Sequence, residues 1–549
     1  MPRARALIIG LDGATLDVAG PWMDAGHLPV LATIRERGVC TPLTTTLPAS
    51  SPAAWSTFAT GTNPGKHGIL TFAQLFEDSY EPVFINASFR RGATFWELAS
   101  RQGTRCVVMN VPCTYPPRPY GGVLLACMLS PGVDRRMASP PEALDDLLAF
   151  SPHYQVDVSV ANRMSPKARE AFVERALATL EGCRQAALGF YRKHRPDLFC
   201  VVFTSTDRVS HYFLPEHMAQ GDDEGRKEDE CADAVLQVYR RADEAVGQLI
   251  AEAGPDTDVV ILSDHGAAPI RKCLSLRRAL AEAGLLVERR PGAARRLAKG
   301  ALLRLVHTVP KAWQRRLISR FGGLAGRAMS TFTSSGIDFA RSRAYPADAA
   351  EGVFVNLRGR QPLGLVRPGR EYEETRQAVM AALSALKDPE TGRPVAKGVY
   401  RREEVWSGPC LERLPDVVME QAEWCYDTKP ISSAMAEGVF SEPRGAGRQG
   451  LYDRARHSRT GLLLAMGPHI RRASVSGARI ADVPATVLAL LGCPIPEDFD
   501  GRVLSEILTD DVAPAARGPA APAQAAEAEG YAEKDRQAVE RRLEGLGYL

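Results

Sequence analysis

Short, continuous apolar runs alternate with longer segments of helical spacing through the first half of the chain. The apolar runs cover residues 6–11, 106–111, 123–128, 198–203 and 258–262, and the helical segments cover 29–37, 93–101, 165–194 and 235–253. Apolar runs of this length without polar alternation predict strands that are buried on both faces. Their alternation with amphipathic helices predicts an α/β fold with a doubly wound, mostly parallel sheet.

The pattern loosens after residue 285 and resumes close to residue 457. Residues 353–357, 371–386 and 416–419 predict a smaller α/β region, and a strand at 461–466 with a helix at 482–491 returns to the core pattern. Residues 511–529 are rich in Ala and Pro, which is typical of a linker, and 533–546 predict a short helix. We therefore expect a core formed by 1–284 and 451–510, an inserted basic helical and small α/β cap at 285–450, and a linker with a C-terminal helix at 511–549.

The composition is that of an ordinary globular protein. The chain has 549 residues, 45% hydrophobic and 24% charged, and its formal net charge of +3 does not indicate a nucleic-acid partner. We find no nucleic-acid-binding motif, no signal-peptide pattern at the N-terminus and no apolar stretch of about 20 residues that would span a bilayer. The 11 cysteines are scattered without a CxxC pair, which favours reduced, buried thiols. We therefore expect a cytoplasmic protein.

A segment of small and hydroxylated residues at 47–69 contains a candidate nucleophile, Ser51. A serine hydroxyl attacks phosphorus or a carbonyl carbon at neutral pH only when a base, a cation or a metal stabilises its alkoxide form. The segment by itself also fits a surface loop followed by a short helix. Other residues must therefore decide between a nucleophile turn and an ordinary loop.

Acidic residues and histidines gather at the ends of the predicted strands. Asp12 follows the first strand, and the other members of the set are Asp207, His211, Asp264, His265 and His457. A DxxxH step and an adjacent Asp-His pair both allow two side chains to reach one metal ion. Each residue alone also fits a helix cap or a hydrogen-bonded core group, but together they predict a metal centre. Mixed Asp and His ligation suits Zn²⁺, and Mn²⁺ is also compatible.

This order of motifs resembles the alkaline phosphatase superfamily, most closely its type I phosphodiesterase/nucleotide pyrophosphatase branch and related bacterial phosphohydrolases. The resemblance covers residues 5–280 and 457–502. It implies two divalent metal ions, one bound by Asp207, His211 and His457 and the other by Asp12, Asp264, His265 and Ser51. The nucleophile of the family lies nine positions before a Thr-Gly pair, and Thr60-Gly61 stands nine positions after Ser51. Ser50 is the alternative nucleophile.

The resemblance implies a metal-dependent phosphoester hydrolase of the phosphodiesterase or nucleotide pyrophosphatase type, acting on a small phosphoester through a phosphoserine intermediate. A phosphomonoesterase or phosphomutase of the same superfamily is the alternative, and a non-catalytic metal-binding regulatory relative is an alternative of another class. The family's Asn beyond the nucleophile is missing here, so Lys66 or Asn110 are candidates for binding a phosphoryl oxygen. Ala53-Ala54 stand where a sulfatase needs an Arg, which disfavours a sulfatase.

A basic segment at 289–327 contains eleven Arg and Lys residues with apolar residues between them. Three interpretations stay open: a solvated helical insertion over the core, a lid whose cations steer an anionic substrate, or a peripheral contact with anionic lipid. The sequence does not identify the substrate.

Overall fold

The structure, a computed structural model, describes residues 4–76, 79–158, 167–218, 231, 233–289, 336–347, 351–428, 438–443, 452–513, 516–520 and 529–545. The basic segment at 289–327 lies outside these residues except for Arg289. Its three interpretations, and the predicted domain boundaries, therefore stay predictions.

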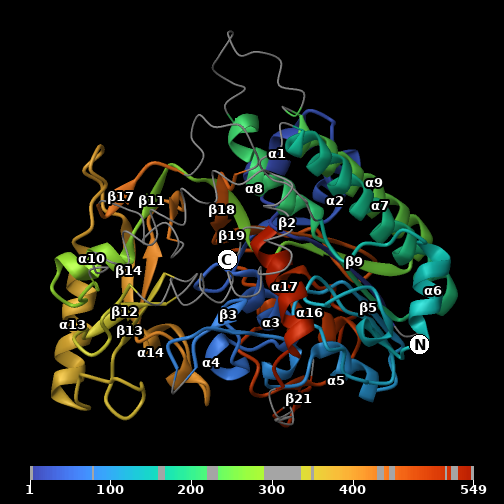
Figure 1. Cartoon of the computed structure of the whole chain (residues 1–549). Coiled ribbons are helices and arrows are strands. Elements are labelled where there is room, and N and C mark those ends of the chain that lie inside the picture. Colours follow the sequence, from blue (N-terminus) through green and yellow to red (C-terminus); the bar gives the residue numbers. More distant parts are fainter. Residues whose placement is uncertain are drawn as a thin grey trace.

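An eight-stranded sheet lies at the centre of the molecule (Figure 1), in the order β2-β19-β9-β1-β8-β5-β6-β7. Its strands are β1 (Arg5–Leu11), β2 (Val39–Thr44), β5 (Cys106–Met109), β6 (Val123–Leu125), β7 (Ala138–Ser139), β8 (Leu198–Phe203), β9 (Thr257–Leu262) and β19 (Thr460–Met466). The pairs β9-β1, β1-β8, β8-β5 and β5-β6 are parallel, whereas β19 runs antiparallel to both of its neighbours and β7 antiparallel to β6. The predicted mostly parallel sheet is confirmed.

Helices cover both faces of this sheet, which is the doubly wound arrangement (Figure 1). One group consists of α1 (Leu16–Asp24), α2 (Pro29–Arg37), α6 (Ala143–Phe150), α7 (Ala168–His194), α8 (Ser205–Met218) and α9 (Ala234–Ala253). The other group consists of α3 (Ser51–Thr60), α5 (Phe95–Arg101) and α16 (Asp482–Leu490), with α4 (Pro64–His67) beside α3. Leu7, Ile8 and Ile9 of β1 are fully buried between these layers, which explains the continuous apolar run.

A smaller antiparallel sheet lies to one side of the central sheet (Figure 1). Its order is β12-β13-β15-β14, with β12 (Ala344–Pro346), β13 (Gly352–Val355), β15 (Val417–Gln421) and β14 (Ala396–Arg401). The helices α10 (Leu276–Glu282), α13 (Arg370–Ser384) and α14 (Arg402–Val405) accompany it, and these elements share a separate apolar cluster. A smaller α/β region is therefore present where the sequence predicted one.

Short ribbons complete the fold. They are β3 (Ala73–Gln74) with β4 (Val83–Phe84), β10 (Gly266–Pro269) with β18 (Ala455–Ser458), β11 (Lys272–Leu274) with β16 (Tyr426–Asp427) and β17 (Phe440–Ser441), and β20 (Ile495–Pro496) with β21 (Arg517–Gly518). The predicted C-terminal helix is α17 (Glu533–Gly545). Arg542 of α17 donates a hydrogen bond to the carbonyl of Met128, and Val539 and Leu543 are fully buried. The end of the chain is thus packed onto the core.

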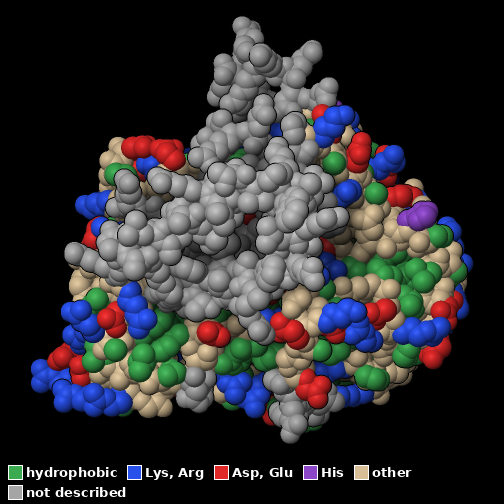
Figure 2. Space-filling view, viewed as in Figure 1, with side chains coloured by type: hydrophobic (Ala, Val, Ile, Leu, Met, Phe, Trp, Pro, Cys, Tyr) green, Lys and Arg blue, Asp and Glu red, His purple; other side chains and the backbone are tan. Residues whose placement is uncertain are grey.

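The distribution of charged residues and cysteines is that of an ordinary globular protein. Acidic and basic side chains are interspersed on the face shown in Figure 2. All cysteines are free thiols, and all but Cys40 are buried, as the absence of a CxxC pair predicted. No helix among the described residues is both long enough and apolar enough to cross a membrane.

Candidate metal centre

Three neighbouring strands in the middle of the sheet lead to the acidic residues. Asp12 follows the end of β1 directly, Asp207 lies four residues after β8, and Asp264 lies two residues after β9. Because β9, β1 and β8 are adjacent and parallel, their carboxyl ends meet at one edge of the sheet, where α/β proteins place their sites. Each of these three residues is at most 1% exposed.

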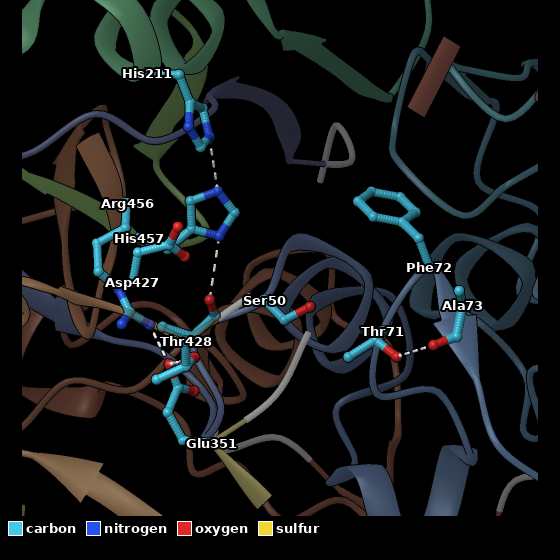
Figure 3. A pocket seen from close by; sticks show the side chains of 11 residues that line it. Ser50, Thr71, Phe72, Ala73, His211, Glu351, Asp427, Thr428, Arg456 and His457 are labelled. Carbon is cyan, nitrogen blue, oxygen red and sulfur yellow. Dashed lines mark hydrogen bonds and ion pairs between the residues drawn. The ribbon is translucent and has the colours of Figure 1, made fainter. Parts of the chain in front are cut away.

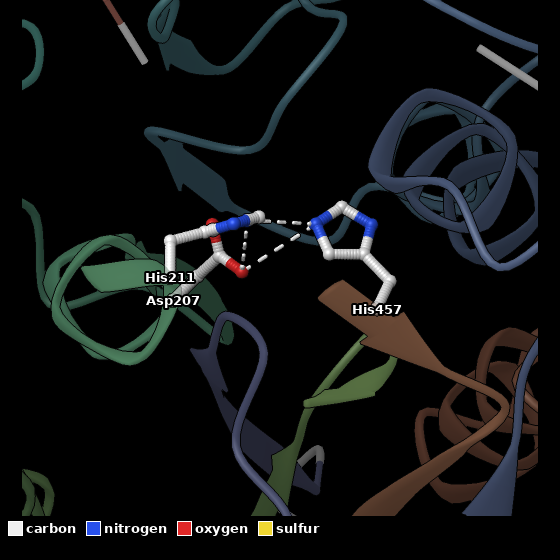
Figure 4. A group of neighbouring side chains, drawn as sticks. All are labelled: Asp207, His211 and His457. Carbon is white, nitrogen blue, oxygen red and sulfur yellow. Dashed lines mark hydrogen bonds and ion pairs between the residues drawn. The ribbon is translucent and has the colours of Figure 1, made fainter. Parts of the chain in front are cut away.

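The first Asp/His group consists of Asp207, His211 and His457 (Figure 4). Asp207 and His211 lie one turn apart on α8, so their side chains share a face of the helix. His457 comes from β18, which pairs with β10 directly after His265. The distances to Asp207 Oδ1 are 3.4 Å from His211 Nε2 and 3.6 Å from His457 Nε2, and the two Nε2 atoms are 3.1 Å apart.

The second Asp/His group consists of Asp12, Asp264 and His265. His265 Nε2 lies 3.2 Å from Asp264 Oδ2 and 3.9 Å from Asp12 Oδ1. Ser51 Oγ lies 3.0 Å from the same Nε2 atom. The imidazole rings of His265 and His457 are stacked with their centroids 3.6 Å apart, so the two groups adjoin one another.

Ser51 is the first residue of a buried helix, not part of a turn. All ten residues of α3 are buried, which excludes the surface loop that the composition of the segment also allowed. Ser50 is the extended N-cap residue, and Gly61, with a φ of 67°, is the C-cap residue after Thr60. The N-terminus of a helix carries a partial positive charge, so α3 places Ser51 where negative charge is stabilised.

The six Asp and His residues fit divalent cations. Four ligands in a tetrahedron around a zinc ion lie about 3.3 Å apart, and the spacings within the two groups are close to this value. Asp12 Oδ1 and Asp264 Oδ2 are buried and accept no hydrogen bond. A buried carboxylate oxygen without a partner is costly, and a bound cation would satisfy it.

Each histidine is oriented through its other ring nitrogen. His457 Nδ1 lies 3.1 Å from the carbonyl of Ala49, and His265 Nδ1 lies 3.0 Å from the carbonyl of Gly266. His211 Nδ1 lies 3.0 Å from Asp453 Oδ1. Donation from Nδ1 to these oxygens directs the lone pair of Nε2 toward the two groups, which is how metal-binding histidines are fixed.

The charges of these groups act on one another in the protein without metal. Burial, with the charges of Asp264 and Asp207, raises the pKa of Asp12 well above its usual value. Burial and the charge of Asp207 raise the pKa of Asp264 to about 7. Burial opposes protonation of His211, but Asp207 and Asp453 outweigh it and raise the pKa of His211 to about 9. The raised pKa values of Asp12 and Asp264 indicate that these buried carboxylates are not fully compensated, and divalent cations would neutralise them.

A buried arginine that the sequence analysis did not single out completes the surroundings of Asp207. Arg208 is 1% exposed and donates to Asp207 Oδ2 over 2.5 Å, and its Nη2 donates to Asp157 Oδ2 over 2.9 Å. The sequence feature that could have identified Arg208 is its position directly after Asp207, because a charged residue that is buried usually has a charged or polar partner. Asp157 and Asp453 are far from Asp207 in the chain and gave no such signal.

Lys66 and Asn110 make contacts outside the two Asp/His groups. Lys66 Nζ forms an ion pair with Asp500 at 2.5 Å, and Asn110 Nδ2 donates to the carbonyl of Val202 over 2.7 Å. Asn110 is buried at the carboxyl end of β5 with a φ of 60°. Their assignment to phosphoryl binding stays a prediction.

The family model for type I phosphodiesterase / nucleotide pyrophosphatase matches residues 6–434. The chain belongs to this family. It is therefore a hydrolase that acts on phosphoric ester or anhydride bonds, and its resemblance to the alkaline phosphatase superfamily is confirmed. A comparison with curated proteins gives no match.

Two solved structures of one enzyme have the same fold as this chain, and a third structure is also similar. Phosphonoacetate hydrolase from Sinorhizobium meliloti in complex with phosphonoformate is 16% identical, with a TM-score of 0.51 over 90% of this chain and 96% of the other. The same enzyme in complex with phosphonoacetate is 17% identical, with a TM-score of 0.50 over the same shares of the two chains. Human ectonucleotide pyrophosphatase / phosphodiesterase 5 is 13% identical, with a TM-score of 0.48 over 92% of this chain and 100% of the other.

Proposed function

We propose that this hydrolase cleaves a phosphodiester or nucleotide pyrophosphate bond with Ser51 as its nucleophile and two divalent metal ions as its cofactors. The observation that carries the proposal is the 3.0 Å distance between Ser51 Oγ and His265 Nε2, at the junction of the two Asp/His groups. Among the hydrogen bonds of the described residues, α3 reaches candidate metal ligands through Ser51 Oγ and through Trp55 Nε1, which donates to Asp12 Oδ2 over 3.2 Å; of these two groups only Ser51 offers a hydroxyl.

Asp207, His211 and His457 would hold one ion, and Asp12, Asp264 and His265 the other together with Ser51. When bound, the ions would lower the pKa of the serine hydroxyl and neutralise the charge that develops on the phosphoryl and leaving oxygens. Imidazole nitrogens combined with carboxylate oxygens suit Zn²⁺, and Mn²⁺ is the alternative.

The serine and its helix carry the covalent chemistry. Ser51 Oγ forms a bond to phosphorus, the bond from phosphorus to the leaving oxygen breaks, and that oxygen leaves with a proton. Water then attacks the phosphoserine, which releases the phosphoryl product and restores the Ser51 hydroxyl. Ser51 is buried and anchored on a rigid helix, so its oxygen is held in place before the substrate arrives.

The test uses bis-p-nitrophenyl phosphate and a nucleoside triphosphate as substrates, with Zn²⁺ or Mn²⁺ added to the purified protein. Ser51→Ala should lower kcat at least about 1000-fold, as expected for removal of a nucleophile, and should leave the metal content unchanged. Ser56→Ala removes another buried hydroxyl from α3 and serves as the matched control. Mass spectrometry of protein quenched during turnover should show phosphate on the peptide that contains Ser51.

Two results would contradict this assignment. Full activity in Ser51→Ala with loss in Ser50→Ala would move the nucleophile by one residue. Turnover that persists after verified removal of all divalent metal would exclude the proposed cofactors.

A further inference from the structure

A tryptophan one helical turn after Ser51 connects α3 to a candidate metal ligand. Trp55 stands four residues after Ser51, so the two side chains leave the helix on the same face. Trp55 Nε1 donates a hydrogen bond to Asp12 Oδ2 over 3.2 Å, and Ser51 Oγ lies 3.0 Å from His265 Nε2. Asp12 and His265 belong to the same Asp/His group. The helix therefore contacts the second group at two points, one turn apart.

The protein holds all but one of the polar atoms of Asp12. The backbone N–H of Asp12 donates to the carbonyl of Phe203 over 3.1 Å, and its carbonyl accepts from the Thr206 hydroxyl over 2.6 Å. Trp55 holds Oδ2, whereas the buried Oδ1 has no hydrogen-bond partner among the described residues. Because the backbone of Asp12 is fixed on both sides, the indole N–H determines how its carboxylate is rotated. Oδ1 is therefore the oxygen that is left for a cation.

The indole ring is itself fixed by its packing. Trp55 is fully buried, and its ring meets the Phe58 ring edge-on, with the centroids 5.4 Å apart. The indole also packs against β1 at Gly10, two residues before Asp12, where an added Cβ atom would lie 2.6 Å from Cη2 of the ring. A side chain at Gly10 would displace the ring, so this glycine gives the indole the room to reach Asp12.

Trp55 lies away from the space through which a substrate would enter. A cavity of about 80 Å³ opens beside the first Asp/His group, and Ser50, His211 and His457 contribute to its wall (Figure 3). Trp55 is not among the described residues that line this cavity. A substrate that enters there does not touch the indole, so Trp55 acts on the chemistry only through Asp12.

We infer that Trp55 is a positioning residue, which turns the free oxygen of Asp12 toward a metal ion and holds this ligand in register with Ser51. The inference rests on the proposed function for the roles of Ser51 and of the ion. It goes beyond that function, because neither the ligand set nor the nucleophile implies a supporting donor on the same helix. A displacement of α3 would move the hydroxyl and the support of the ligand together, which keeps their relative geometry.

The test compares two ways of removing the indole N–H. Trp55→Phe keeps an aromatic ring, and 3-benzothienylalanine incorporated at position 55 keeps the bicyclic shape with sulfur in place of the N–H group. In competition with a chromogenic chelator, both variants should bind one of the two Zn²⁺ ions about 10-fold or more weakly and the other with a smaller change. With Co²⁺ as the probe, the visible absorption spectrum should also change, because it reports the geometry of the ligands. Trp96→Phe, at a buried tryptophan of α5, makes the same change in volume and is the matched control.

Kinetics at saturating Zn²⁺ provide a further readout. We expect kcat to fall about 10-fold in both variants at position 55 and KM to stay within about twofold, because the indole does not touch the substrate. Unchanged Zn²⁺ affinity and an unaltered Co²⁺ spectrum in the benzothienylalanine variant would overturn the inference, also if Trp55→Phe does not fold. Failure of the proposed function is a different result: Ser51→Ala would keep full hydrolysis, while the variants at position 55 would still bind metal more weakly.

Discussion

Arg208 fixes the direction in which Asp207 presents its carboxylate. One oxygen, Oδ2, accepts from Arg208, and the other, Oδ1, lies 3.4 and 3.6 Å from the Nε2 atoms of His211 and His457. Asp157 neutralises the guanidinium on its far side, at 2.9 Å. A carboxylate held in this way offers one oxygen to a metal and cannot rotate freely, so Arg208 acts as a positioning residue.

The first prediction is that Arg208→Met lowers the affinity of the first Asp/His group for Zn²⁺ about 10- to 100-fold, the usual cost of losing such a supporting contact. Arg208→Lys should restore part of the affinity, because an ammonium keeps the charge but not the two-sided geometry. Competition with a chromogenic chelator measures the affinity. The double variant Arg208→Met/Asp157→Asn avoids a buried unpaired carboxylate, and Arg241→Met, at an exposed arginine on α9, is the control. Unchanged affinity in both Arg208 variants would contradict the positioning role.

The second prediction concerns the pH dependence of metal binding. The pKa of Asp264 is raised to about 7, so below that pH its carboxyl group holds a proton that a metal must displace. The pKa of His211 is raised to about 9, which extends the same competition in the first group to higher pH. Affinity should therefore rise with pH, by up to about tenfold per unit for each proton released. Calorimetry between pH 6 and pH 8 in buffers of different ionisation enthalpy counts the protons, and an affinity independent of pH would contradict the shifts.

The three acidic residues of the two Asp/His groups could be placed from the sequence because each one follows an apolar run. Asp12, Asp207 and Asp264 stand where a parallel sheet exposes the ends of its strands, so the strand pattern alone places them at one edge. Asp157 and Asp453 could not be predicted, because they contact the site from loops without a periodic pattern. Their partners are known only once the fold is known.

At the scale of elements, the turn after β1 controls how closely the two Asp/His groups approach. Gly13 has a φ of +66°, its backbone N–H donates to Asp264 Oδ1 over 3.2 Å, and a Cβ atom at this position would lie 2.7 Å from Asp207 Oδ1. Only glycine combines this backbone conformation with so close a contact.

The third prediction is that Gly13→Ala displaces Asp207 and lowers metal occupancy, while Gly26→Ala does not. Gly26 also has a positive φ, of +76°, but a Cβ atom there would meet no atom within 4 Å. Both variants should lose about 1 kcal/mol of folding free energy from backbone strain. Any additional loss in Gly13→Ala is the cost of the contact between the new methyl group and Asp207. Metal analysis by mass spectrometry and chemical denaturation provide the two readouts. Equal metal content in the two variants would show that the site tolerates the added methyl group.

The bounds of helices and strands could be predicted from the sequence where one feature, such as an N-terminal proline or a continuous apolar run, determines them. The helix α2 has the predicted bounds, with a proline at its first position, and β8 has the predicted bounds because its six residues are all buried and apolar. The strand β2 was missed because it contains Pro42 and alternates with polar residues. Its place at the edge of the sheet tolerates a residue without an N–H group. Ser51 was assigned to a turn because Ser-Pro favours turns, although Pro is equally suited to the first turn of a helix.

At the scale of the whole molecule, the candidate metal centre joins parts of the chain that are remote in sequence. The first group combines residues of α8 with His457 of β18, and β18 reaches the site only through its pairing with β10 after the smaller sheet. The order of motifs in the sequence indicates that Asp207, His211 and His457 form one group. The spacing of these residues does not show that β18 pairs with β10. Three buried carboxylates, from Asp12, Asp207 and Asp264, meet at the junction.

The fourth prediction is that removal of metal destabilises the whole fold. Three buried carboxylates repel one another without cations, and a ligand present at about 1000 times its Kd stabilises the folded state by about 4 kcal/mol. Chelation by EDTA should therefore lower the melting temperature and abolish hydrolysis together, and added Zn²⁺ should restore both. Asp264→Asn removes one of the charges, so this variant should lose activity and show a smaller shift with EDTA than the unmodified protein. Asp197→Asn, at a carboxylate paired with Arg105 away from the two groups, should keep the full shift. An unchanged melting temperature in protein shown to be metal-free would mean that the two Asp/His groups hold no structural cation.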